Sequence, residues 1–129
     1  MSKTFFVMIS TDPDIDPMKS LVALACATQA TSDGHEVNVF FAANAVKLLQ
    51  ADYLKSLDSR ISQPTGFCKD MFDNLIQRAR IYCSTLSQAV NGVTPDNAHD
   101  VLVGGYELQW SGPPGVVTLS SSADVTLSF

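Results

Sequence analysis

TFFVMI at residues 4–9 and EVNVFF at residues 36–41 are the two stretches that decide the fold of this chain. The first is a continuous apolar run of β-forming residues, which is typical of a strand covered on both faces. Between the two, the Asp-Pro pair at residues 16–17 is a favourable helix start and Gly34 a favourable stop, so we predict a helix over residues 17–32. A strand, a helix and a second strand in this order indicate parallel strands joined by a helical crossover.

The rest of the chain continues this alternation of strands and helices. The expected elements, in chain order, are a helix over residues 44–51, an irregular polar segment over 52–66, a helix over 67–79, a strand over 79–83, a short helix over 84–90, and strands over 101–104 and 125–129. Residues 116–122 fit either a helix or a strand, because their valines and threonine oppose the helix that the alternation demands. We therefore predict one α/β domain over residues 1–129, a three-layer α/β/α sandwich around a mostly parallel sheet of about five strands.

The composition narrows the range of partners and compartments. The chain has 129 residues, of which 46% are hydrophobic and 16% charged, and its net charge is −5. A net negative charge argues against nucleic acid and anionic membranes as partners, and no apolar run is long enough to span a bilayer. Three cysteines, an odd number without a CxxC pair, fit a cytoplasmic protein whose thiols stay reduced.

Polar side chains follow the predicted strands where ligands usually bind. In a parallel sheet, ligands and chemistry collect beyond the carboxyl ends of the strands. In this chain those ends carry Asp12, then Asn44, and finally Cys83 with Ser84 and Thr85. We therefore expect these side chains to lie along one edge of the sheet.

The aspartates at positions 12, 14 and 16 have a spacing similar to the start of a calcium loop. Prolines at positions 13 and 17 interrupt that pattern, and the later glycine and glutamate of such a loop are missing. We interpret the three carboxylates as loop solvation and helix capping, and we expect no metal and no organic cofactor.

Cys83 is the candidate reactive residue. It ends a strand directly before a helix start, where free backbone N–H groups and the helix dipole favour the thiolate over the thiol. His99 would lower the pKa of this thiol further if it lay beside the sulfur. The alternative interpretation is a small buried hydrophobe at a strand end, since free cysteine is among the most buried residue types.

The predicted helix over residues 17–32 has an implication for assembly. Its stretch LVALACA at residues 21–27 is apolar around the whole helix, so we interpret Cys26 as a packing residue. A helix that is apolar on every side also needs cover on its outer face, which predicts a contact with another subunit.

The chain resembles the DsrE/DsrF-like family, which includes sulfur-relay subunits related to TusD. The resemblance rests on GHEVNVFF at residues 34–41, IYC at 81–83, AVNGV at 89–93 and SADVTLSF at 122–129. It implies the fold predicted above, a homo-oligomer such as a trimer or hexamer, and a persulfide carried on Cys83. It also implies sulfur donor and acceptor proteins as partners.

Two features depart from the family pattern. Residues 106–115 look like an insertion before the last strand, and they could form either a lid over the thiol or a subunit contact. Cys83 is followed by the polar Ser84 and Thr85, where small apolar residues are common in relay subunits.

Cys68 could resolve a persulfide on Cys83 as a disulfide.

Two hypotheses from different classes follow. The first is a sulfurtransferase-type carrier in which Cys83 accepts sulfane sulfur and passes it to a partner thiol. The second is a non-catalytic oligomeric module of the same fold, which binds a small ligand or a protein at the edge formed by the strand ends, with Cys83 merely packed.

Overall fold

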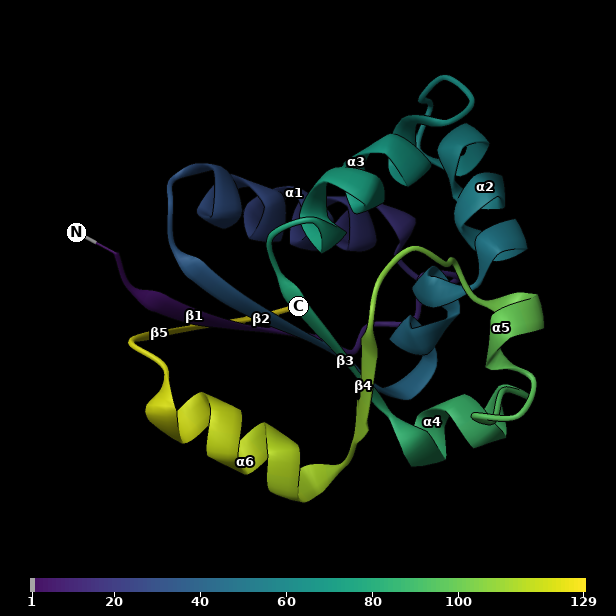
Figure 1. The fold of residues 1–129 in the computed structure, drawn as a ribbon. Helices are drawn as coiled ribbons and strands as arrows, with labels where there is room; N and C mark the ends of the chain where they lie inside the picture. Colours follow the sequence, from purple (N-terminus) through teal and green to yellow (C-terminus); the bar gives the residue numbers. More distant parts are fainter. Residues whose placement is uncertain (1) are drawn as a thin grey trace.

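The computed structural model describes residues 2–129 and has a five-stranded parallel sheet at its centre (Figure 1). The strands lie in the order β4-β3-β2-β1-β5, and all four neighbouring pairs are parallel. Their bounds are β1 (Thr4–Ile9), β2 (Glu36–Phe41), β3 (Arg80–Ser84), β4 (Leu108–Ser111) and β5 (Val125–Ser128). The predicted α/β class and the sheet of about five strands are confirmed.

Helices cover both faces of this sheet, as the three-layer prediction requires. They are α1 (Pro17–Ser32), the 3₁₀ helix η1 (Ala43–Leu49), α2 (Ala51–Arg60), α3 (Phe67–Ile76), α4 (Thr85–Val90), α5 (Ala98–Val101) and α6 (Pro113–Ser122). Figure 1 shows α1 and α3 on one face, α6 on the other, and α4 and α5 beyond the carboxyl ends of the strands. Among residues 2–129, no helix is both long and apolar enough to cross a membrane.

The crossover between β1 and β2 is built as its sequence predicts. Asp16 is the N-cap of α1, and its carboxylate accepts a hydrogen bond from the backbone N–H of Lys19 at 3.1 Å. Pro17 occupies the first helical turn, where its missing N–H costs nothing. After the helix, Gly34 has a φ of 88°, a left-handed conformation that glycine adopts without strain.

Strand alternation divides the sheet into two different faces. In register, Ile9 pairs with Phe41 and Phe41 with Cys83, so these three buried side chains point to the face covered by α1 and α3. Phe40 points to the other face, against α6. A Cβ on Gly115 would lie 2.0 Å from Ser111 Oγ and 3.1 Å from Ser111 Cβ, so a larger residue there would force the connection between β4 and α6 to shift.

Two predicted elements were wrong. Residues 52–66 were expected to be irregular, but α2 occupies residues 51–60, because Leu54 and Leu57, three positions apart, bury one face of a mostly polar helix. A fourth strand was expected over residues 101–104. That region instead holds the end of α5 and a single antiparallel bridge between Leu102 and Gln50, and the fourth strand is β4.

The structure also defines the secondary structure of residues 106–115 and of the ambiguous residues 116–122. The first contributes β4, an edge strand of the sheet, and then the start of α6. The second is helical throughout, because α6 runs to Ser122. Pro113 sits in its first turn, where proline favours a helix start despite the valines that follow.

Candidate functional site

The carboxyl ends of β1 and β2 meet a network of polar side chains. Asp12 accepts a hydrogen bond from Asn44 Nδ2 at 3.0 Å and forms an ion pair with Lys47 Nζ at 3.3 Å. Asn91, after α4, donates from Nδ2 to Asn44 Oδ1 at 3.4 Å. The structure therefore brings together Asp12 and Asn44, which the strand order predicted to share one edge.

Asp14 extends this network and is fully engaged by side chains of its own protein. The Tyr53 hydroxyl, Lys47 Nζ at 2.9 Å and Arg60 Nη1 at 2.9 Å all donate to its carboxylate. These three hydrogen bonds hold the pKa of Asp14 well below its ordinary value, with the largest effect from Tyr53, the next from Lys47 and then Arg60. The contacts fasten the loop after β1 to η1 and α2. Within the described chain, no group of three or more His, Cys, Asp or Glu side chains is arranged to hold a metal ion.

Ser84 and Thr85 serve the junction between β3 and α4. Ser84 Oγ accepts a hydrogen bond from the backbone N–H of Ser87 at 3.1 Å and so caps α4. Thr85 Oγ1 donates to the carbonyl of Ser111 at 3.2 Å, which ties the start of α4 to the end of β4. Both hydroxyls therefore have structural partners.

Cys83 lies on the inner face of β3 and is completely buried. Its register partners are Phe41 on β2 and Trp110 on β4, and the exposed fraction of Cys83 is 0%. Ser84 points to the opposite face of the sheet, as successive strand residues must. The structure therefore separates Cys83 from the neighbour that was expected to share its site.

The expected preference of Cys83 for the thiolate is wrong for this structure. Burial raises the pKa of the Cys83 thiol to about 11, and the nearby Gln88 amide offsets only part of that rise. At neutral pH the resting Cys83 is a protonated thiol.

Two buried polar groups, not predicted as site residues, surround this thiol. Gln88, on α4, has an exposed fraction of 0%, and neither its Nε2 nor its Oε1 has a hydrogen-bond partner among the described residues. The Tyr106 hydroxyl is likewise buried without a partner. Burial, followed by the charge of a nearby Cys83 thiolate, raises the pKa of Tyr106. Gln88 and Tyr106 therefore converge on Cys83 from α4 and from the segment before β4.

The remaining candidate residues have other surroundings. The His99 side chain is 76% exposed and pairs with Asp100, with 3.4 Å between Nε2 and Oδ1, so it does not act on the buried thiol. Cys68 is buried at the start of α3, where burial and the Asp58 carboxylate raise its pKa to about 12. Cys26 is half-buried on α1. All three cysteines are free thiols.

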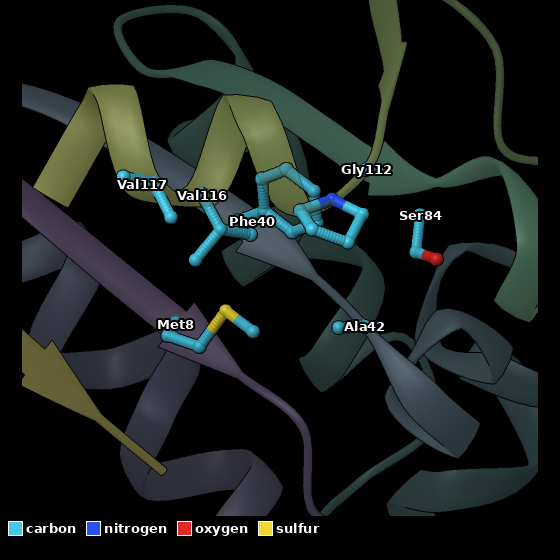
Figure 2. A pocket seen from close by; sticks show the side chains of 8 residues that line it. Met8, Phe40, Ala42, Ser84, Gly112, Val116 and Val117 are labelled. Carbon is cyan, nitrogen blue, oxygen red and sulfur yellow. The ribbon is translucent and has the colours of Figure 1, made fainter.

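Two cavities of about 310 Å³ each open near the strand ends, on different faces of the sheet. The first is almost wholly apolar and lies between the sheet and α6, where Figure 2 shows Met8 of β1 and Phe40 of β2 beside Val116 and Val117 of α6. Its lining also includes the Ser84 side chain.

The second cavity lies along the edge strand β4, beside α5. Its lining includes the exposed His99 of α5, Val103 and Gly104 from the loop that follows, and the side chains of Tyr106 and Trp110, but not Cys83. Tyr106 and Trp110 both line this cavity and both lie near Cys83, because Trp110 is its register partner on β4 and a Cys83 thiolate acts on Tyr106 through its charge.

Comparison with known proteins places this chain in a family. The profile described as the DsrE/DsrF-like family matches residues 3–129. No curated protein matches the chain.

Solved structures agree on the fold. The YchN protein from E. coli superposes with a TM-score of 0.69 at 15% identity, and each chain is covered over 100% of its length. MTH1491 from Methanobacterium thermoautotrophicum, a protein of unknown function, gives 0.68 at 14% identity, again with 100% of both chains covered. BT1422 from Bacteroides thetaiotaomicron, also of unknown function, gives 0.56 at 15% identity over 98% of this chain and 95% of its own. With a family match that spans residues 3–129, this chain belongs to the DsrE/DsrF-like family.

Proposed function

We propose that this protein carries sulfane sulfur as a persulfide on Cys83 and passes it to a partner thiol. Membership of the DsrE/DsrF-like family supports a role related to sulfur relay. The observation that carries the proposal is the setting of Cys83, which faces two buried polar groups that have no partner among residues 2–129. A cysteine that served packing alone would lie among apolar groups, because an unpaired buried amide destabilises a fold.

The transfer needs no external oxidant or cofactor. The Cys83 thiolate attacks the outer sulfur of a donor persulfide, so that a new S–S bond forms on Cys83 as the S–S bond of the donor breaks. The donor leaves as a thiolate and takes up the proton that Cys83 released. The reverse steps deliver the sulfur to an acceptor thiol. The partners of this reaction are therefore a sulfur donor and a sulfur acceptor, and the cytoplasm, where thiols stay reduced, is its compartment.

The closed site sets the conditions for loading. A buried thiol with a pKa of about 11 is almost entirely protonated at neutral pH, and only the thiolate is a nucleophile. Loading is therefore slow unless the site opens to a donor. The same closure would protect a persulfide, once formed, from stray thiols in solution.

The proposal predicts that sulfur loads on one cysteine only. After incubation with inorganic polysulfide, intact mass spectrometry should show a gain of one or more sulfur atoms for the wild type. Cys83→Ala should show no gain, whereas the matched variants Cys26→Ala and Cys68→Ala should load like the wild type. The loading rate should rise about tenfold per pH unit between pH 7 and 10, following the thiolate fraction.

A wild-type protein that gains no sulfur at any of these pH values, and whose Cys83 also resists alkylation, would sink this proposal. The second candidate would then stand.

The second candidate is a non-catalytic oligomeric module that binds at the strand-end edge, and the apolar cavity beneath α6 favours it. No residue of α6 is fully buried, although the helix carries two valines and a leucine. Val117, beside the cavity, is 65% exposed. On the other layer, Met18 and Val22 on α1 are 51% and 46% exposed. We propose that a second copy of the chain covers such surfaces in a homo-oligomer, a trimer or hexamer.

Assembly through α6 can be tested with one charge. Val117→Asp should shift the protein toward monomer in light scattering, because a carboxylate in an apolar contact loses its hydration. Thr118→Asp, the neighbouring exposed position on the same helix, is the matched control and should leave the mass unchanged. A wild-type protein that scatters as a monomer contradicts the assembly, and an unchanged mass for Val117→Asp removes α6 from the interface.

A further inference from the structure

We propose that Gln88 and Tyr106 are positioning residues that hold the outer sulfur of a persulfide on Cys83, and that the cavity along β4 is the route by which the sulfur arrives. This inference rests on the proposed function and adds to it the groups that bind the transferred atom.

Gln88 is a buried polar side chain beside Cys83. Its side chain is completely buried, and both of its polar atoms lack a hydrogen-bond partner among the described residues. Leaving a buried amide unpaired costs about 1–3 kcal/mol, and native proteins contain few such groups. The amide nonetheless lies close enough to Cys83 to favour its thiolate. The fold thus keeps a buried amide donor beside the Cys83 sulfur, where it favours the thiolate form, and leaves the rest of its hydrogen-bonding capacity unused.

Tyr106 brings a second buried polar group near Cys83 from a different part of the chain. Its ring packs edge-on against Phe72, with 5.6 Å between the ring centroids, so its place is fixed by the core. Its hydroxyl is buried and unpaired within the part of the chain that the structure describes. A thiolate on Cys83 acts on that hydroxyl through its charge, so the two groups lie near each other.

The chemistry of a persulfide fits these two donors better than that of a thiol. A thiol is a weak donor and a weak acceptor, and it cannot satisfy an amide and a phenol together. A persulfide anion carries its charge on an additional sulfur, which can accept hydrogen bonds from the Gln88 N–H and the Tyr106 O–H. Hydrogen bonds to a charged acceptor are about twice as strong as neutral ones. Loading would therefore satisfy groups that are unpaired in the unloaded protein.

The route to this space follows from the cavity along β4. Tyr106 lines that cavity, and the glycines at positions 104 and 105 precede it. Gly105 has a φ of 89°, which a side chain would oppose. The two glycines therefore place few steric restraints on the backbone before Tyr106. The cavity beside this segment, of about 310 Å³, can admit the persulfide end of a donor.

The test is an acid titration of the loaded protein. Wild type, Gln88→Met and Tyr106→Phe are loaded with inorganic polysulfide, and the perthiolate is followed by its ultraviolet absorbance as pH is varied. Each variant should raise the pKa of the persulfide by about one unit, a tenfold change in its acid constant, because a hydrogen bond to the anion is lost. Gln77→Met and Tyr82→Phe, which replace an exposed glutamine and a tyrosine on the other face of the sheet, should leave it unchanged.

The outcomes separate this inference from the function on which it rests. If the wild type takes up no sulfur, the carrier function fails and this inference with it. If the wild type loads but both variants titrate like it, the carrier stands and the positioning roles are overturned. A variant that folds yet cannot retain the outer sulfur supports the roles, since the unloaded fold does not need these hydrogen bonds.

Discussion

Phe72→Ala is expected to lower the free energy of unfolding by about 3–5 kcal/mol, the usual cost of removing a fully buried phenylalanine. Phe72 has an exposed fraction of 0% and packs against Phe41, with 6.5 Å between the ring centroids, as well as against Tyr106. Its removal leaves a cavity that the sheet and α3 can fill only in part. Urea unfolding followed by circular dichroism measures the change.

The same substitution should also expose the buried thiol. The Phe72 ring packs against Tyr106, which lines the cavity along β4 and lies near Cys83. Alkylation of native Cys83 should therefore be faster in Phe72→Ala than in the wild type. Phe67→Ala, on the same helix but only half-buried, is the matched control and should cost less. A loss below about 1 kcal/mol for Phe72→Ala would contradict this view of the core.

Much of the fold could be predicted because its elements carry strong local signals. The strands at residues 4–9 and 36–41 and the helix at 17–32 have the bounds predicted from an apolar run, an Asp-Pro start and a glycine stop. The fourth strand was misplaced because residues 101–103 are Val-Leu-Val, a pattern with high β-propensity. A right-handed crossover must first bring the chain back to the amino edge of the sheet, so these residues belong to the return path and β4 starts later.

The surroundings of Cys83 were harder to predict. The alternation of strands and helices in the sequence was enough to place Cys83 at the carboxyl edge of the sheet. The face of the sheet to which its side chain points could not be predicted, because it depends on which helices cover each face. Nothing in the sequence indicated that Gln88 would be buried beside Cys83. Hydrophobic patterning would turn Leu86 and Val90 of α4 inward, yet these are 76% and 75% exposed, and the glutamine between them is buried. A helix that breaks the pattern in this way is expected at a functional site or a subunit contact.

Asp58→Ala is the second substitution that we expect to lower the free energy of unfolding strongly. The role of Asp58 was also not predicted from the sequence. This carboxylate is 3% exposed and accepts hydrogen bonds from the backbone N–H groups of Gly66 and Cys68, each at 2.8 Å. Its carboxylate caps the N-terminus of α3, because the N-cap residue itself is Gly66, which has no side chain. Asp58→Ala leaves both N–H groups without their charged acceptor and should cost about 3 kcal/mol.

The pH dependence of this loss distinguishes a charge effect from a packing effect. Burial alone would raise the pKa of Asp58, but the hydrogen bonds from the Cys68 N–H and thiol and from the Gly66 N–H outweigh it and leave the pKa lowered from its ordinary 3.8. A carboxyl with a lowered folded pKa stabilises fully above its unfolded pKa and loses that contribution as pH falls through the folded value. Urea unfolding should therefore show a larger gap between wild type and Asp58→Ala at pH 7 than at pH 3. Asp73→Ala, which removes an exposed partner of Lys69, should cost under about 0.5 kcal/mol at pH 7. A gap for Asp58→Ala that stays constant between the two pH values would mean that its volume, and not its charge, stabilises the start of α3.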